Sequence, residues 1–258
     1  HLKYRNMRFT HKLLIAVAAL CMTASLSAQK NDATLYFTVD EMPDLIKCLP
    51  APPDTCSAEF TNDILRYMWG KQQRLDSARA AIALRDAVWS YDALFAEFNV
   101  PFGLTISKEG TPEIYKLLVN SLSTIDQTCR RPKAYYMRKR PFVRFNEHML
   151  STWEEKDLYN EGSYPSGHTL RGFACALLLS EVNPANADTI LRRGYIYGES
   201  RVIVGAHWQS DVDASRISAP IGLARLHTSK EFLKQLAKAQ DEFAKLTGKV
   251  KGKTQKKK

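Results

Sequence analysis

The chain has 258 residues, of which 45% are hydrophobic and 25% are charged, and its formal net charge is +10. These proportions are ordinary for a folded protein and exclude a wholly disordered chain, while 12 Gly and 11 Pro residues exclude a collagen-like repeat. A net charge of +10 raises the question of a nucleic-acid or membrane partner, and the answer depends on where the basic residues lie.

The basic residues are concentrated at the two ends of the chain. Residues 1–28 contain four basic and no acidic side chains, and residues 249–258 contain six basic and no acidic ones. The remainder is therefore neutral overall, which argues against nucleic acid as a partner. We expect residues 248–258 to form a disordered basic tail, because they hold almost no side chain that could be buried.

A secretory signal peptide is predicted over residues 1–28. Basic residues precede the apolar run from Leu13 to Met22, and small and polar residues follow up to Ala28. This order is typical of a cleaved signal, and the run is too short to span a bilayer permanently. Met7 is the expected natural start, which places residues 1–6 outside the natural chain. We expect a periplasmic or secreted protein with no stable membrane insertion after cleavage.

Four cysteines follow the predicted signal peptide. Cys48 and Cys56 flank a Pro-rich segment, and in an oxidising compartment a disulfide between them would hold that segment in place. We favour this bridge. Cys129 and Cys175 could form a second bridge or stay as buried thiols. The cysteine spacings match no zinc signature.

The chain divides into an irregular beginning and a long helical part. Residues 29–58 are Pro-rich with few periodic apolar positions, and from there helical periodicity dominates. Thr111 and Ser229 are predicted helix caps. Helices are predicted over 63–73, 76–98, 111–122, 167–182, 186–199, 208–226 and 229–246. Strand patterns are scarce, so we predict an all-α fold, one compact helical bundle over residues 59–247 with about seven to nine helices.

Three segments could carry chemistry. His207 and Asp211 are four residues apart, which on a helix would let the carboxylate orient the imidazole, although most such pairs are ordinary hydrogen bonds. Ser166 and Gly167 precede an apolar helix, whose free backbone N–H groups could bind an anion or simply be capped. The basic and aromatic segment 133–141 lacks the recurring stacking pattern of a nucleic-acid site, and alone it would be read as a solvated face.

Taken together, the three segments fit a phosphate monoester. Lys133, Arg140 and Arg201 supply positive charge, and two histidines could supply a nucleophile and a proton donor. A phosphate monoester dianion needs these functions, and this set provides them without a metal ion.

The same segments resemble the signature of the bacterial class A nonspecific acid phosphatases, within the superfamily of type 2 phosphatidic acid phosphatases and vanadium haloperoxidases. That signature is Lys-x6-Arg-Pro, then Pro-Ser-Gly-His, then Ser-Arg-x5-His-x3-Asp. The chain fills it from Lys133 to Pro141, from Pro165 to His168 and from Ser200 to Asp211. The resemblance covers roughly residues 45–247, and the pair Leu170-Arg171 after His168 is a local departure that leaves the shape of the substrate pocket open.

The resemblance implies a fold and a mechanism. His207 would attack phosphorus and form a phosphohistidine, His168 would act as general acid and then general base, and Asp211 would orient His207. The implied phosphate-binding residues are Lys133, Arg140, Ser166, Gly167 and Arg201. No cofactor and no metal ion are expected. Because His207 must be neutral while His168 is protonated, a bell-shaped pH profile with an acidic to near-neutral optimum is expected.

The implied activity is metal-independent hydrolysis of small phosphomonoesters, with phosphotransfer to alcohols as a side reaction and a homo-oligomer as one possible assembly. Three alternatives stay open at this point. The first is a vanadium-dependent haloperoxidase, although those chains are usually much longer. The second is a lipid or diphosphate phosphatase, although those usually carry several membrane-spanning helices. The third is a basic binding protein with an inactive site. The physiological substrate does not follow from the sequence.

Overall fold

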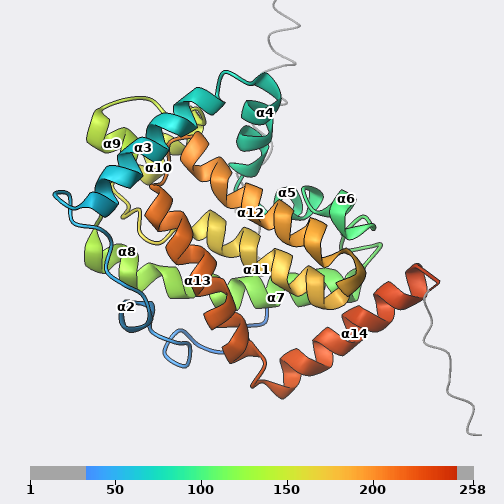
Figure 1. The fold of residues 1–258 in the computed structure, drawn as a ribbon. Helices are drawn as coiled ribbons and strands as arrows, with labels where there is room; N and C mark the ends of the chain where they lie inside the picture. The colour runs from blue at the N-terminus through green and yellow to red at the C-terminus, as the bar shows by residue number, and fades with distance from the viewer. Residues whose placement is uncertain (1–32, 249–258) are drawn as a thin grey trace, which may run out of the picture. The chain divides into compact units, whose positions relative to one another are not determined.

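The computed structural model describes residues 33–248, so the predicted signal peptide and nearly all of the predicted basic tail lie outside the described residues. Figure 1 shows this part of the chain as helices joined by loops, with no strand among them. Residues 33–248 fall within one compact unit. The predictions of an all-α fold and of a single helical domain are therefore confirmed.

Seven of the helices within residues 33–248 have ten or more residues, and the others are short. The long helices are α3 (Ala58–Gln73), α4 (Ser77–Asp86), α7 (Pro112–Asp126), α11 (Gly167–Val182), α12 (Ala187–Ile203), α13 (Gln209–Leu226) and α14 (Lys230–Leu246). The short ones are α2 (Leu45–Cys48), α5 (Tyr91–Ala96), α6 (Asn99–Phe102), α8 (Arg130–Tyr136), α9 (Pro141–Phe145) and α10 (Glu155–Leu158), together with the 3-10 turns Gln127–Cys129, Thr152–Glu154 and Pro184–Asn186.

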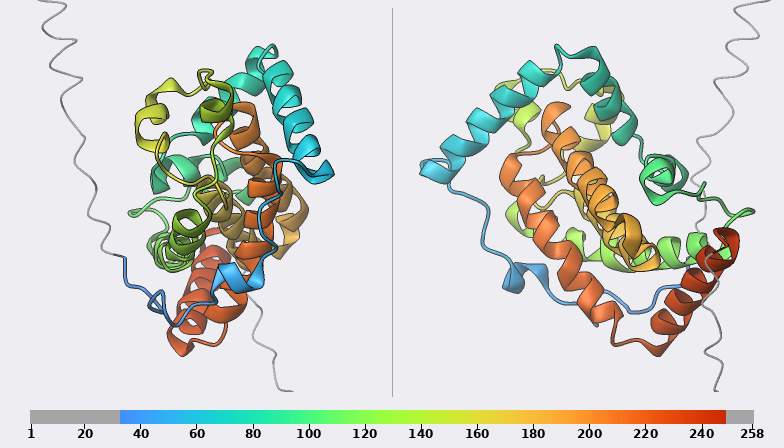
Figure 2. Two further views of the ribbon diagram at one scale, coloured as in Figure 1. Left: turned by 90° about the vertical axis from the view of Figure 1, so that its left-hand side faces the viewer. Right: turned by 45° about the vertical axis from the view of Figure 1, so that its right-hand side comes forward.

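Helix α11 is the centre of the bundle. Apolar residues occur on all sides of it, and Leu170, Ala174 and Leu178 are completely buried. A helix that is apolar all round is stable only when neighbours cover every face. Helices α7, α12, α13 and α14 pack against it, as the two views in Figure 2 show. Gly172 allows α12 to approach closely, because a Cβ atom there would lie 2.3 Å from the ring of Tyr197.

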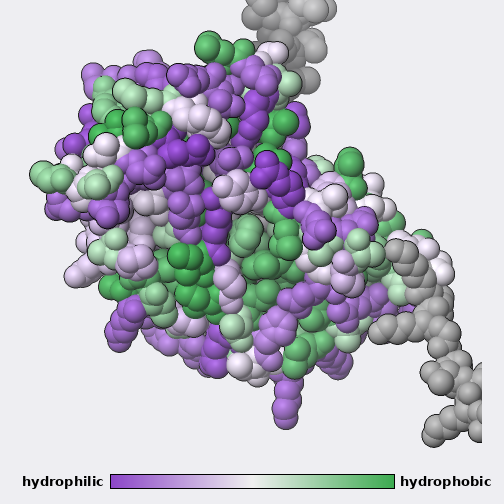
Figure 3. Space-filling model, in the orientation of Figure 1, coloured by the Kyte–Doolittle hydropathy of each residue, from purple (hydrophilic) through white to green (hydrophobic). Residues whose placement is uncertain are grey.

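Helix α14 covers the core from the outside. Its buried side chains Phe232, Leu236, Ala239 and Phe243 recur at helical spacing and belong to the main hydrophobic cluster. The face of the molecule in Figure 3 is mostly hydrophilic, with apolar groups near its centre around α12 and α13. Burial of this stripe of α14 stabilises the fold, since apolar burial contributes roughly 25 cal/mol per Å².

The prediction of one continuous helix over 76–98 is wrong, because the structure has two helices there with a break between them. Helix α4 ends at Asp86, and α5 begins after Ser90, whose hydroxyl accepts a hydrogen bond from the backbone N–H of Ala93 at 3.1 Å. A serine that can cap a helix favours a new start over continuation of the old one. The break places Trp89 in a loop instead of on an apolar helix face.

The disulfide favoured between Cys48 and Cys56 is not formed. Both are exposed free thiols, and Cys129 and Cys175 are buried free thiols. Burial raises the pKa of Cys129 to about 12, which keeps that thiol protonated. Cys48 ends α2, the chain bends at Leu49, and residues 50–54 of the Pro-rich segment form neither helix nor turn. Residues that precede proline favour extended backbone, which agrees with the lack of helix over residues 50–54 between the two cysteines.

Candidate active site

The start of α11 presents two predicted site residues to a cavity. Ser166 is the N-cap residue, and its hydroxyl accepts a hydrogen bond from the backbone N–H of Thr169 at 3.3 Å. The backbone N–H of Ser166 donates to the carbonyl of Asp211 at 3.2 Å, which joins the start of α11 to the first turn of α13. Gly167 and His168 then line the cavity, while Ser166 itself is fully buried.

His207 lies in the loop between α12 and α13 and is held on both ring nitrogens. Its Nε2 lies 2.9 Å from Nη1 of Arg140, and its Nδ1 lies 3.4 Å from Oδ2 of Asp211. A guanidinium can only donate, so Nε2 accepts and the ring proton lies on Nδ1, where it faces the carboxylate. Burial and the nearby cations Arg140, Lys133 and Arg201 hold the pKa of His207 well below its ordinary value. The imidazole is therefore neutral, with its lone pair on Nε2.

Asp211 is itself fixed by a buried network. Its Oδ2 accepts a hydrogen bond from the backbone N–H of Trp208 at 2.9 Å, and its Oδ1 accepts one from Arg138 Nη1 at 2.5 Å. Arg138 also donates to Asp63 of α3 at 2.7 Å, and Asp63 in turn accepts from the backbone N–H of Ser210 at 2.8 Å. Two carboxylates and one guanidinium thus tie the start of α13 to α3.

The three predicted phosphate-binding cations are brought to one region, and each is paired with a glutamate. Arg140 Nη2 lies 3.0 Å from one oxygen of Glu161, and Lys133 Nζ lies 3.3 Å from the other. Arg201 donates to both oxygens of Glu154, at 3.1 and 2.8 Å. Its Nε is buried and makes no hydrogen bond within the described part of the chain. This geometry leaves one arginine donor available for a further acceptor.

Burial affects the acidity of the cations. It lowers the pKa of Arg140 to about 10 and also lowers the pKa of Lys133, to which the neighbouring charge of Arg140 contributes. Charged groups placed out of water in this way gain from an anionic partner, because the partner compensates for the lost hydration. The loop of Glu161 is close to Lys133, since a Cβ atom on Gly162 would lie 2.2 Å from the Lys133 carbonyl oxygen.

His168 is positioned by the loop that follows α4. Its Nε2 lies 3.2 Å from the carbonyl oxygen of Ala87, so this nitrogen donates, and it lies 3.8 Å from Glu154. The indole of Trp89 packs against the imidazole with 4.4 Å between ring centroids. Burial, followed by the charges of Arg201 and Arg171, holds the pKa of His168 well below its ordinary value. In the free protein this histidine is therefore neutral.

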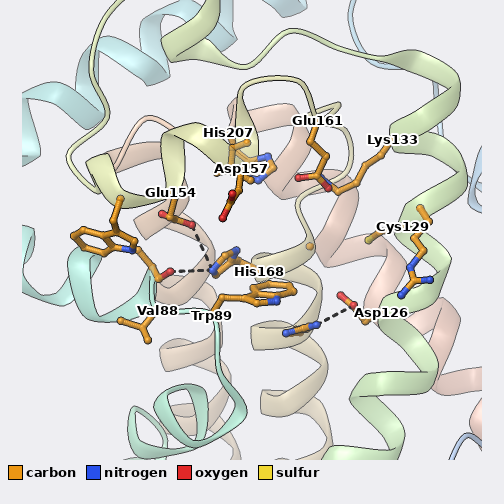
Figure 4. A pocket seen from close by; sticks show the side chains of 16 residues that line it. Val88, Trp89, Asp126, Cys129, Lys133, Glu154, Asp157, Glu161, His168 and His207 are labelled. Carbon is orange, nitrogen blue, oxygen red and sulfur yellow. Dashed lines mark hydrogen bonds and ion pairs between the residues drawn. The ribbon is translucent and has the colours of Figure 1, made fainter. Parts of the chain in front are cut away.

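A cavity of about 660 Å³ joins these groups. Figure 4 shows His168 and Trp89 on one side of it, with His207, Lys133 and Glu161 across from them. Of the predicted residues, Lys133, Gly167, His168 and His207 line the cavity. Arg140, Arg201, Ser166 and Asp211 are not among the lining residues and are buried beside them, each at most 1% exposed.

Several residues of the site were not predicted from the sequence. Glu154 ends the 3-10 turn Thr152–Glu154, Glu161 lies in the loop after α10, and no sequence pattern distinguishes either of them. Arg138 lies inside the first motif segment, where its position two residues before Arg140 was the only available signal. The periodic spacing of Trp89 predicts an apolar helix face, whereas in the structure its side chain lines the cavity.

Two further observations concern residues 33–248. No group of three or more His, Cys, Asp or Glu side chains there is arranged to hold a metal ion. None of the helices in this range has the length and apolar character of a membrane span.

Comparison with known proteins places the chain in a family. The PAP2 superfamily matches residues 115–230. A non-specific acid phosphatase of Providencia stuartii is 45% identical over 222 residues, covering 84% of this chain and 89% of that protein. A non-specific acid phosphatase of Salmonella typhimurium is 41% identical over 76% of this chain and 78% of its own length. An acid phosphatase of Zymomonas mobilis is 31% identical over 90% of this chain and 86% of its own length. The chain therefore belongs to the bacterial non-specific acid phosphatases of the PAP2 superfamily.

Proposed function

We propose that the protein hydrolyses phosphate monoesters through a phosphohistidine formed on Nε2 of His207, with no metal ion. The observation that supports this best is the contact of Nε2 with Arg140 at 2.9 Å while Nδ1 faces Asp211. These contacts keep the lone pair on the nitrogen next to the cations. A substrate phosphate that takes over the hydrogen bonds of Arg140 would free that lone pair for attack on phosphorus.

The cations would bind the non-bridging oxygens of the phosphate. Lys133 and Arg140 exchange their bonds to Glu161 for bonds to the substrate, and Arg201 contributes its unpartnered Nε. The backbone N–H groups at Gly167 add donors at the positive end of α11. Donors fixed in place before the reaction stabilise the charge that develops on these oxygens as the N–P bond forms.

His168 would supply the proton for the departing oxygen. It is neutral in the free protein, because burial and two arginines oppose its charge. A bound phosphate dianion reverses part of this effect, so protonation of His168 accompanies substrate binding. In the first step the N–P bond forms, the ester P–O bond breaks, and His168 gives its proton to the leaving oxygen. In the second step His168 takes a proton from water, which attacks phosphorus and releases His207.

The remaining parts of the proposal follow from the same chemistry and from the sequence. An alcohol that replaces water in the second step would be phosphorylated, which gives a phosphotransferase side reaction. The pattern of residues 1–28 supports export to the periplasm or the medium. The proposed substrates are small phosphomonoesters of broad range, and the homo-oligomer that the family resemblance implies is one assembly to test.

The test is a pair of histidine variants. His207→Ala should lower turnover of a chromogenic phosphomonoester by several orders of magnitude at pH values around 4–8. It should also abolish the acid-labile, alkali-stable phosphoprotein trapped by rapid quenching during turnover. His227→Ala is the matched control, because His227 pairs with Glu181 outside the cavity. Near wild-type turnover in His207→Ala, with the circular dichroism spectrum unchanged in both variants, would refute His207 as the nucleophile.

A further inference from the structure

Trp89 occupies an unusual place for a large aromatic side chain. It lines the cavity, it contacts the proposed general acid His168 at 4.4 Å between ring centroids, and it is still 51% exposed. Burying an aromatic ring is favourable, so a half-exposed indole in a cavity is a surface that a bound molecule could cover. Figure 4 shows its ring beside His168.

The indole is held in a fixed orientation by an arginine. The guanidinium carbon of Arg171 lies 3.3 Å from the ring centroid of Trp89, so the guanidinium stacks on the ring. Arg171 also donates to Asp126 at 3.0 Å, and its own backbone is part of α11, three residues after His168. The helix that carries the general acid therefore also carries the group that orients the indole.

The chemistry of the proposed first step places the leaving group against this surface. His168 can protonate the ester oxygen only from within hydrogen-bond distance, so the atoms attached to that oxygen must lie next to the imidazole. Trp89 is the aromatic side chain in ring contact with that imidazole among the described residues. A flat aromatic ring one or two bonds beyond the ester oxygen can stack on the indole, whereas a puckered saturated ring of the same size gains only apolar contact and lacks the aromatic–aromatic contribution.

We propose that Trp89, oriented by Arg171, forms a subsite that selects phosphomonoesters with an aromatic ring one or two bonds from the ester oxygen, that is, aryl and arylmethyl phosphates. This inference rests on the proposed function, because it takes His168 as the proton donor to the leaving oxygen.

Benzyl phosphate and cyclohexylmethyl phosphate form a suitable test pair. Both release a primary alcohol of similar size and basicity, so their intrinsic reactivities are close and their difference reports the flat ring. We expect the wild-type protein to have about fivefold higher kcat/KM for benzyl phosphate, which corresponds to about 1 kcal/mol of aromatic stacking. Trp89→Leu should reduce the ratio to about one, and Trp89→Phe should retain most of it.

Trp69→Leu is the matched control. Trp69 is also stacked by an arginine, with the guanidinium carbon of Arg66 at 3.8 Å from its ring, but it does not line the cavity. Its substitution should leave the ratio at the wild-type value. Equal kcat/KM for the two esters in the wild type, or an unchanged ratio in Trp89→Leu, would overturn the subsite while leaving the proposed function intact. Failure to hydrolyse either ester would overturn the proposed function and the subsite with it.

Discussion

Glu161 occupies the position where the proposed substrate must bind, so replacing it should strengthen anion binding. Its carboxylate oxygens lie 3.0 Å from Arg140 and 3.3 Å from Lys133, and its side chain is 45% exposed. A phosphate must either displace this carboxylate or bind beside it, and both cost free energy. Glu161→Gln removes the negative charge while keeping the shape of the side chain. We therefore expect phosphate and its esters to bind more tightly to this variant.

The magnitude follows from the two ion pairs. Because the glutamate side chain is about half exposed, each pair contributes roughly 0.5–1 kcal/mol after solvent screening. Loss of both competing contacts amounts to about 1–2 kcal/mol, which is roughly a five- to thirtyfold decrease in the dissociation constant of an anion. The apparent gain should shrink as ionic strength rises, because the competing contact is partly exposed to solvent.

The assay is competitive inhibition by inorganic phosphate at constant pH and ionic strength. Glu161→Gln should lower the inhibition constant by the stated factor. Glu147→Gln is the control, because Glu147 makes a similar half-exposed pair with Lys71 at 2.8 Å and does not line the cavity. An inhibition constant in Glu161→Gln that equals or exceeds that of the control would refute the competition between this carboxylate and phosphate.

Three other outcomes are expected. Arg171→Gln should raise the pKa of His168, because it removes a positive charge that lowers that pKa. The alkaline limb of the pH profile of kcat/KM should therefore move to higher pH. The control is Arg192→Gln, on the exposed surface of α12, which should leave the alkaline limb in place. The free energy of unfolding should fall as the pH drops below the ordinary imidazole pKa of 6.5, by up to about 1.4 kcal/mol per pH unit for each of His168 and His207. The cause is that the two imidazoles bind protons in the unfolded chain but stay neutral in the folded one. Urea unfolding between about pH 5 and 7 measures this, and a free energy of unfolding that does not change with pH would contradict it. Prolonged treatment with EDTA should leave turnover unchanged, because lysine and arginine side chains are expected to neutralise the charge of the phosphate. Strong inhibition by EDTA that added metal reverses would contradict this.

The long helices could be predicted because their signals are local. The apolar run of α11 begins and ends within residues 167–182, as periodicity indicated, and Ser229 caps α14 by accepting a hydrogen bond from the Phe232 backbone N–H at 3.2 Å. Thr111 does precede α7, but its hydroxyl makes no cap hydrogen bond and accepts instead from the backbone of Ser107 at 3.0 Å. The local preference of threonine for a helix N-terminus thus predicts where α7 starts, but it does not predict the hydrogen bond that the Thr111 hydroxyl makes.

The candidate site was predictable only in part, for a physical reason. His207 and Asp211 are close in sequence, so their contact follows from helical geometry. The partners of the cations lie far away along the chain or in irregular segments, as Glu154 does for Arg201, 47 residues apart. Contacts of this kind depend on how the helices pack, and hydrophobic periodicity carries no information about them.

The network behind Asp211 sets a lower limit to the size of an active protein. The three motifs span residues 133–211, yet Asp63 of α3 anchors the arginine that holds Asp211, and the carbonyl of Ala87 holds His168. Neither residue touches the cavity's cations, and both precede the motifs by more than forty positions. A shortened chain that began at the first motif would keep each catalytic side chain and lose the supports of both histidines. In evolutionary terms, the segment before the motifs cannot be exchanged freely for an unrelated one, even though it contributes no reacting group.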